Sequence, residues 1–431
     1  MKLCHPKTLQ IHYRMAAAAN RLPEQVELLK HDGTFVLLRF LSKIGSGSQG
    51  TVYKATIDGT EYAVKSVSLR FSEGKYNRTA FNAESVIARN IRNVKNADNS
   101  NSQHICKFFG IIERKPGDEK PPNEFVYYDT RPLNAGESPK FYFIYELIAG
   151  ESLTNLIERG LTPMQIVDYG RQLLEACVAF HKSGIAHNDL KPDNIIIDER
   201  GILKLIDYGL SCKAATCHTI RGMTLEYGAP EILELTGIHK QVIKAVFNPF
   251  STDMFSIGCI LYELITRRKL FLDSRIPRFF DATHLPIIDL NEPNKQYEPL
   301  LRSMVSFDPT SIPILPVIND LLRQVYEKGD SATVARLGPL IAESAKKLKP
   351  FGRERPKAVA ALQMWNELHP RAAVVVEQPR PEGGLPAASI ESRAVVGEII
   401  AAVNDTNATK EAKGGRQTRK RKDRLSKKRR R

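Results

Sequence analysis

The amino-acid sequence predicts an α+β protein with two lobes, a small β lobe followed by a larger, mainly helical lobe. Between residues 35 and 148, short apolar runs of strand character are interrupted by a single helical pattern. Beyond residue 148, apolar residues recur mostly at helical spacing. At 431 residues the chain is long enough for two or three domains with buried cores.

The β lobe is predicted to contain five strands and one main helix. The strands are expected near residues 35–41, 51–56, 61–65, 104–110 and 141–148, and the helix near residues 81–91. Residues 1–30 show no clear periodicity and are expected to form an N-terminal extension. Residues 114–140 are charged and contain five prolines, so a long surface insertion is expected there.

A glycine-rich turn joins the first two predicted strands. Gly45, Gly47 and Gly50 are spaced so that the backbone can lie close over a phosphate group and offer its N–H groups as donors. The sequence after Gly50 continues as a strand, whereas the dinucleotide-binding fold requires a helix at that point. A dinucleotide-binding fold is therefore disfavoured.

Lys65 and Glu84 are candidates for an ion pair beneath this turn. Lys65 lies on a predicted apolar strand, and Glu84 lies 19 residues later on the predicted helix. Such a pair would direct the lysine ammonium at phosphate oxygens. The alternative is a lysine that extends from a strand edge to solvent and a glutamate on a solvated helix face.

Acidic and amide side chains flank a predicted hairpin in the helical lobe. The segment 187–194, His-Asn-Asp-Leu-Lys-Pro-Asp-Asn, precedes two apolar runs, 195–197 and 202–206, joined by a turn. Because a hairpin returns the chain to its starting point, Asp189 and Asn194 are expected close to Asp207. Carboxylate and amide oxygens suit hard cations. The alternative is a polar loop beside an ordinary hairpin.

Two long helices are expected in the helical lobe, and the second is expected in its middle. Apolar residues between 166 and 183 recur at helical spacing, and Gly184 follows as the expected C-cap. His181 on that helix is expected to be a packed core histidine. The segment 253–265 is apolar on nearly every face, which is typical of a buried helix.

Composition limits the remaining possibilities. The six cysteines show no framework spacing and are expected to be reduced thiols in an intracellular protein. Cys212, Cys217 and His218 match no zinc-binding pattern and lack a fourth ligand. No apolar run is long enough to predict a membrane span.

Most of the net charge lies at the C-terminus. Residues 413–431 contain twelve Lys or Arg and one acid, a net charge of +11, whereas the other 412 residues carry +4. Such a segment cannot fold, because its charges repel and it has almost nothing to bury. We expect a nuclear import signal or a nucleic-acid contact there; a purely solubilising tail is the alternative.

The motifs, taken in order, resemble those of eukaryotic-type protein kinases of the Ser/Thr class over residues 35–325. The motifs that carry the resemblance are Gly45, Gly47 and Gly50 with Val52; Ala63-Val64-Lys65; Glu84; residues 187–194; Asp207-Tyr208-Gly209; and Gly228-Ala229-Pro230-Glu231. The resemblance implies boundaries of 31–148 for the N-lobe and 149–330 for the C-lobe. A helical extension (331–370), a linker (371–412) and the basic tail (413–431) would follow.

The resemblance also implies ATP and Mg²⁺ as cofactors and assigns roles to residues. Lys65, held by Glu84, would bind the α- and β-phosphates, and Asp207 with Asn194 would hold Mg²⁺. Asp189 would accept the proton of a substrate hydroxyl, Lys191 would reach the γ-phosphate, and Thr224 would bridge these two residues. The residues expected around the nucleotide are Ile44, Gly45, Gly47, Gly50, Val52, Ala63, Lys65, Tyr145 as gatekeeper, and Glu146 to Ile148 as the adenine hinge.

Three positions depart from the family pattern. Asn188 replaces the arginine that pairs with an activating phosphate, so activity is predicted not to depend on phosphates at Thr216 or Thr219. Tyr208 replaces the usual Phe, which adds a hydroxyl that needs a partner. Ile312 occupies the place of a late arginine, so Glu231 is predicted to lack its ion-pair partner.

The functional prediction is a nuclear or cytoplasmic protein Ser/Thr kinase that acts on protein substrates and does not span a membrane. One alternative is a pseudokinase scaffold, although Lys65, Asp189, Asn194 and Asp207 are all present. A second is a nucleic-acid-associated protein with a secondary kinase lobe. Phosphorylation of a small molecule is a third.

Overall fold

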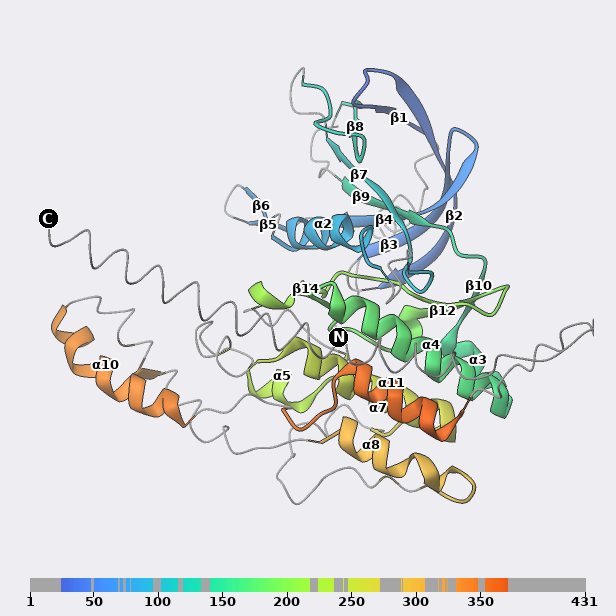
Figure 1. Cartoon of the computed structure of the whole chain (residues 1–431). Coiled ribbons are helices and arrows are strands. Elements are labelled where there is room, and N and C mark those ends of the chain that lie inside the picture. Colours follow the sequence, from blue (N-terminus) through green and yellow to red (C-terminus); the bar gives the residue numbers. More distant parts are fainter. Residues whose placement is uncertain are drawn as a thin grey trace, which may run out of the picture. The chain divides into compact units, whose positions relative to one another are not determined.

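The computed structural model describes residues 25–370 apart from 48–49, 69, 73–74, 78, 96–101, 115–118, 133–139, 218–223, 236–242, 244–246, 272–287, 289, 307–316, 318–319, 322–323, 325–330 and 348–352. These described residues form one compact unit, shown in colour in Figure 1. The predicted linker (371–412) and basic tail (413–431) lie outside the described residues.

The N-terminal part of this unit is a closed β-barrel with the strand order β1-β2-β3-β4-β9-β7-β8 (Figure 1). Its strands are β1 (Gln25–Leu29), β2 (Phe35–Gly47), β3 (Gly50–Ile57), β4 (Thr60–Ser68), β7 (Phe108–Arg114), β8 (Val126–Asp129) and β9 (Lys140–Glu146). A separate two-stranded sheet, β5 (Arg70–Ser72) with β6 (Lys75–Asn77), precedes the helix of this lobe.

The prediction of five strands is wrong, because two further strands close the sheet into a barrel. Strand β1 lies in the segment predicted as an extension, and β8 lies in the segment predicted as a surface insertion. They pair with each other at Leu28 with Asp129 and at Leu29 with Tyr128. Strands of five and four residues are too short to show a clear two-residue period in the sequence. Closure leaves this sheet without an exposed edge.

Two cores hold the β lobe together. The first fills the barrel with fully buried side chains such as Leu28, Leu38 and Val64. The second lies between the barrel and helix α2 (Thr79–Ile91), where Phe81 packs on Phe141 with ring centroids 4.7 Å apart. This packing fixes α2 against the sheet and therefore fixes the position of Glu84.

The C-terminal part of the unit is mainly helical, as predicted. Its helices are α3 (Leu153–Arg159), α4 (Pro163–Lys182), α5 (Pro230–Glu234), α7 (Pro249–Thr266), α8 (Glu298–Met304), α10 (Ser331–Lys346) and α11 (Ala358–Leu368). Its short strands are β10 (Gly150–Ser152), β11 (Ile185–Ala186), β12 (Ile195–Asp198), β13 (Leu203–Leu205) and β14 (Cys212–Lys213). No described helix is long and apolar enough to cross a membrane.

Local sequence explains the ends of the central helices. Thr162 and Gln165 form a reciprocal capping box at the start of α4. Gly184 follows the end of α4 with φ +71°, the left-handed conformation that glycine adopts at little cost. Asn248 caps α7 by accepting hydrogen bonds from the amides of Phe250 and Ser251.

Helix α11 belongs to the core of the helical lobe, although the sequence placed it in an extension after that lobe. Trp365 is fully buried, stacks on Tyr297 with centroids 5.3 Å apart, and donates its indole N–H to the Val167 carbonyl. Gly170 of α4 makes this contact possible, since a Cβ there would lie 2.3 Å from the indole ring. Helix α11 therefore contributes to the fold of the lobe.

The prediction that Glu231 lacks an ion-pair partner is wrong. Arg355, just before α11, makes a bidentate pair with Glu231, and one of the two N–H···O distances is 2.9 Å. Arg355 also donates to the carbonyls of Ser306 and Ser251, and both charged side chains are essentially inaccessible to solvent. The prediction took 308–312 as the arginine-bearing segment, whereas the partner lies 124 residues after Glu231.

We predict that Arg355→Met destabilises the protein by about 3–5 kcal/mol, because it leaves the buried Glu231 carboxylate without a compensating charge. Chemical denaturation measures the free energy of unfolding. Arg353→Met is the matched control, since the Arg353 side chain is 46% exposed. Equal stabilities of the two variants would contradict this role for Arg355.

Candidate active site

An ion-paired cluster connects the β lobe to the helical lobe. The ammonium of Lys65, on β4, lies 2.8 Å from Glu84 Oε1 on α2 and 2.8 Å from Asp207 Oδ1 after β13. Lys65 and Glu84 are each only 5% exposed. The alternative of a lysine and a glutamate reaching solvent is therefore not what the structure shows. One lysine joins a strand, a helix and the segment after the hairpin.

Electrostatics favour the charged forms of this cluster. Burial alone would lower the pKa of Lys65, but attraction to Glu84 and then to Asp207 outweighs it, so the net pKa lies above the ordinary value. Burial alone would raise the pKa of Asp207, and the nearby Lys65 charge lowers it below the ordinary value. A positive charge is thus held permanently at the point where the two lobes meet.

A second cluster surrounds Asp189. Its carboxylate accepts hydrogen bonds from the Asn194 amide at 3.0 Å and from the Thr224 hydroxyl at 2.7 Å. The Lys191 ammonium lies 3.2 Å from the Asp189 carboxylate and 2.9 Å from the Thr224 hydroxyl oxygen. The structure therefore brings all four side chains together, and Thr224 contacts both Asp189 and Lys191.

Helix α7 holds the backbone on which Asp189 sits. Asp253, 1% exposed, accepts hydrogen bonds from the backbone amides of His187 at 2.8 Å and Asn188 at 2.7 Å. Asp189 N donates to His187 Nδ1, and His187 Nε2 lies 3.1 Å from the Ile206 carbonyl. Neutral His187 with its proton on Nε2 satisfies both contacts.

Cys177, His181 and Asp253 lie close enough together to suggest a metal site. Hydrogen bonding already accounts for this group, because both Asp253 oxygens accept backbone N–H groups and His181 Nε2 contacts Oδ2 at 3.0 Å. His181 also packs against Phe250 with ring centroids 4.4 Å apart. The group is therefore assigned a structural role, consistent with the expectation of a packed histidine.

The glycine-rich turn is the hairpin between β2 and β3, although its tip, 48–49, lies outside the described residues. Gly50 has φ +144°, and a Cβ there would lie 2.0 Å from the Ser66 carbonyl oxygen, so only glycine fits. Val52 pairs with Lys65 across β3 and β4. Ala63 pairs with Tyr145 across β4 and β9.

The remaining residues expected at the nucleotide differ in exposure. Ile44 is 49% exposed, and Gly45 pairs with Val52, so both lie on the hairpin. Gly47 pairs with Gly50 at the end of the same hairpin. The Tyr145 hydroxyl lies 3.3 Å from Glu84 Oε1, which directs this side chain toward the cluster around Lys65.

The chain segment after β9 is fixed by an ion pair that the sequence analysis did not find. Lys204, on β13, binds both carboxylate oxygens of Glu146 at 2.9 and 3.1 Å. Glu146 Oε2 also accepts the Lys107 amide, and the Glu146 amide donates to the Lys107 carbonyl. Ile148 packs against the main core. No local pattern around Lys204 indicates its partner, which lies 58 residues away.

Tyr208 has the hydrogen-bond partners that its hydroxyl requires. The side chain is fully buried, and its hydroxyl donates toward the carbonyls of Leu205 at 2.7 Å and Cys106 at 3.2 Å. Burial raises the pKa of Tyr208 well above its ordinary value, so the hydroxyl stays protonated. Its ring lies between His187 and Tyr145, with centroids 5.9 and 6.0 Å away.

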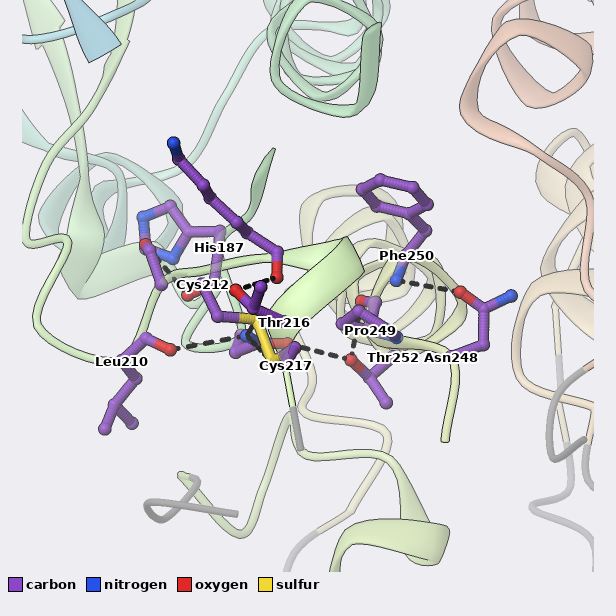
Figure 2. The surroundings of a disulfide bond; sticks show 12 residues. His187, Leu210, Cys212, Thr216, Cys217, Asn248, Pro249, Phe250 and Thr252 are labelled. Atoms are coloured by element: carbon purple, nitrogen blue, oxygen red, sulfur yellow. Dashed lines mark hydrogen bonds between the residues drawn. A yellow bond between two sulfur atoms is a disulfide. The ribbon is translucent and has the colours of Figure 1, made fainter. Parts of the chain in front are cut away.

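The prediction that all cysteines are reduced is wrong for two of them. Cys212 and Cys217 form a disulfide beside the segment that carries His187 (Figure 2). Asn188 Nδ2 donates to the Cys212 sulfur at 3.1 Å. Cys106, Cys177 and Cys259 are buried free thiols. A pair of cysteines five residues apart was the available signal, but the prediction of reduced thiols rested on the absence of a repeated cysteine framework.

The arrangement suits a metal–nucleotide complex. The Asn194 amide nitrogen donates to Asp189, which leaves the amide oxygen as the atom this side chain can offer a cation. Asp207 supplies a carboxylate in the same region. Mg²⁺ prefers such oxygen ligands together with phosphate oxygens and water. Asp207 and Asn194 could therefore hold Mg²⁺, and Lys65 could bind the phosphates.

Known proteins are similar in sequence to the part of the chain that forms this site. A family model described as the protein kinase domain matches residues 38–325. The chain is 34% identical over 144 residues to CBL-interacting serine/threonine-protein kinase 18 of Arabidopsis thaliana, covering 32% of this chain and 26% of that protein.

Two further relatives give similar values. Identity to the serine/threonine-protein kinase stk11 homolog of Dictyostelium discoideum is 33% over 179 residues, 40% of this chain and 30% of the relative. Identity to CBL-interacting protein kinase 24 of Oryza sativa subsp. japonica is 36% over 148 residues, 33% of this chain and 30% of the relative. The match thus spans less than a third of the length of each relative.

We predict that Tyr208→Phe lowers the free energy of unfolding by about 1 kcal/mol, since the carbonyls of Leu205 and Cys106 lose the hydroxyl donor that they share. Thermal or chemical denaturation measures this change. Because the ring and its contacts remain, the arrangement around Lys65 should persist. An unchanged or increased stability would show that the hydroxyl makes no net contribution.

Proposed function

The chain belongs to the protein kinase family, and on that premise we propose that it is a protein serine/threonine kinase that transfers the γ-phosphoryl group of ATP to a protein hydroxyl. The observation that carries the proposal is the Thr224 hydroxyl, held between the Asp189 carboxylate and the Lys191 ammonium at 2.7 and 2.9 Å. The relatives named as serine/threonine kinases support the same class of substrate.

Each charged side chain in the two clusters has a role in this reaction. Mg²⁺ bound with ATP would supply the positive charge that neutralises the transferred group. Asp207 and Asn194 would hold it, and Lys65 would orient the α- and β-phosphates. Glu84 keeps the Lys65 ammonium in place. The glycine turn would lie over the phosphates with its backbone N–H groups.

Asp189 is the proposed proton acceptor. Its carboxylate is 5% exposed and is held by the Asn194 amide and the Thr224 hydroxyl, so it points in one direction. A substrate hydroxyl placed there would be oriented for attack and would lose its proton to Asp189. The Lys191 ammonium, 22% exposed, would neutralise charge on the γ-phosphate.

The same contacts weigh against the alternative functions. A pseudokinase scaffold has no need for Lys65, Asp189, Asn194 and Asp207 to form two fully paired clusters, as they do here. A small-molecule kinase would use the same phosphotransfer chemistry on a different acceptor. A phosphotransfer assay with a peptide library, using Mg²⁺ and ATP, separates a protein kinase from both alternatives.

We predict that Asp189→Asn lowers kcat by about 10²- to 10⁴-fold, because the amide cannot accept the hydroxyl proton, while nucleotide affinity changes little. Asp193→Asn is the matched control: Asp193 lies in the same loop, but it is exposed and accepts a hydrogen bond from Thr154. Comparable rates for the two variants would exclude Asp189 as the base.

We further propose that the basic segment 413–431 directs the kinase to the nucleus or to acidic partners. The proposal is supported by its net charge of +11, which arises from twelve basic residues and one acid. A segment without aromatic residues has nothing to stack on bases, so any nucleic-acid binding would be electrostatic.

Removal of residues 413–431 should abolish nuclear accumulation of a fluorescent fusion and leave peptide phosphorylation unchanged. The control keeps the segment but replaces its Lys and Arg residues by Gln, so that the effect of its charge is tested at constant length. If nucleic-acid contact is the role, DNA affinity of the full chain should fall steeply with salt and vanish on deletion. If the deletion changes neither localisation nor DNA binding, the proposal is wrong and the segment has only a solubilising role.

A further inference from the structure

We propose that the Cys212 and Cys217 disulfide is a reversible redox site that, through Asn188, holds the segment after Asp207 against residues 187–194, the catalytic loop that carries Asp189. The oxidised chain is then the more active form, and a dithiol reductant lowers its rate. This inference rests on the proposed phosphotransfer function. It adds a modification site and names Asn188 as a positioning residue.

The disulfide closes the loop 212–217. This loop lies against β11, the strand that leads into the catalytic loop. Cys212 lies on β14 and pairs with Ala186 on β11, three residues before Asp189. Between the two cysteines the chain makes a short 3₁₀ turn, Ala214–Thr216, and the Ala214 amide donates to the Gly184 carbonyl. The bridge thus holds both ends of residues 212–217 at the base of the catalytic loop.

Asn188 links that closed loop to Asp189 and to helix α7. Its Nδ2 donates to the Cys212 sulfur at 3.1 Å and to the Leu210 carbonyl at 3.3 Å. Its Oδ1 accepts the Thr252 hydroxyl at 3.2 Å, and its backbone amide donates to Asp253. The side chain next to the proposed base therefore has the disulfide as one of its fixed partners.

The conformation of Asn188 depends on these contacts. Its φ is +61°, a left-handed conformation that costs energy for residues other than glycine. A polar side chain held by three partners offsets that cost. Loss of the sulfur at its fixed place removes one of the partners and frees residues 212–217 to move. Because Asp189 follows immediately, its carboxylate loses part of its orientation.

The two cysteines of the bridge differ in their exposure to solution. Cys212 is half-buried, whereas Cys217 is 8% exposed, so we assign attack to the Cys212 sulfur. A thiolate of the dithiol reductant bonds to Cys212, the sulfur–sulfur bond breaks, and Cys217 leaves as a thiolate that takes up a proton. The second reductant thiol then releases Cys212 as a thiol. Two electrons and two protons pass to the chain, and the reductant becomes a disulfide.

The disulfide would also take the role that a phosphate on the segment after Asp207 would otherwise have, which is to hold that segment in place. Thr216 is exposed within the closed loop, and Asn188, which contacts the bridge, has no charge with which to bind a phosphate. Regulation at this position would thus come from electron transfer to the disulfide. Phosphorylation of Thr216 is not required for the contacts that Asn188 makes.

The test compares the full-length chain in oxidised and dithiol-reduced forms, with the bridge counted by mass spectrometry of non-reduced peptides. We expect kcat to fall roughly three- to thirtyfold on reduction, the range that closing a short loop can supply, and to return on reoxidation. The dissociation constant of Mg²⁺-ATP should stay constant, since Lys65 and Asp207 lie outside the closed loop. Hydrogen exchange of residues 185–189 should accelerate.

Three variants separate the site from general effects of thiols. Cys212→Ala/Cys217→Ala should have the reduced rate in both buffers. Asn188→Gly removes the side chain without adding strain at the positive φ, and it should lower the oxidised rate toward the reduced rate. Thr216→Ala should keep the full redox response.

Four outcomes would overturn the proposal: no bridge in the oxidised chain, equal kcat in both forms, a redox response that persists in the double cysteine variant, or unchanged exchange of residues 185–189. Absence of phosphotransfer in both forms is a different result, because it refutes the proposed function. In that case faster hydrogen exchange on reduction would still support the anchoring role, and unchanged exchange would refute it.

Discussion

The ion pairs of the Lys65 ammonium are the interaction on which the site depends. Glu84 lies on a helix packed against the barrel, and Asp207 follows a hairpin of the helical lobe, so the one buried lysine charge joins both lobes. Without the lysine, two carboxylates would face each other in a region with little water. The lysine removes that repulsion and defines where negatively charged phosphates can be accommodated.

The surrounding fold serves to fix the partners of that charge. Closure of the barrel and the contact of Phe81 with Phe141 position Glu84. On the other side, Asp253 accepts the amides of two residues before Asp189, and a fully paired His187 connects that loop to the segment before Asp207. Rigid supports of this kind let acidic and basic groups stay charged and oriented in a partly buried site.

The sequence predicted the parts of the site that depend on short-range order. The hairpin that returns Asp207 toward Asp189 and Asn194 has a clear strand–turn–strand pattern, and the glycine turn has a readable spacing. It could not predict Arg355 as the partner of Glu231, because an ion pair over 124 residues leaves no periodic signal. The pattern in the sequence that could have indicated this region was the Arg355-Pro356 pair, followed by an amphipathic helix with the one tryptophan of the chain.

The central claim is that Lys65, Asp189, Asn194 and Asp207 surround one metal–nucleotide site, and a crystal structure with Mn²⁺ in place of Mg²⁺ and a non-hydrolysable ATP analogue tests it most directly. We expect one anomalous scattering peak or more between Asp207 and Asn194, with Lys65 on the phosphates and still paired with Glu84. Nucleotide bound elsewhere, or metal bound without contact to Asp207, would contradict the account.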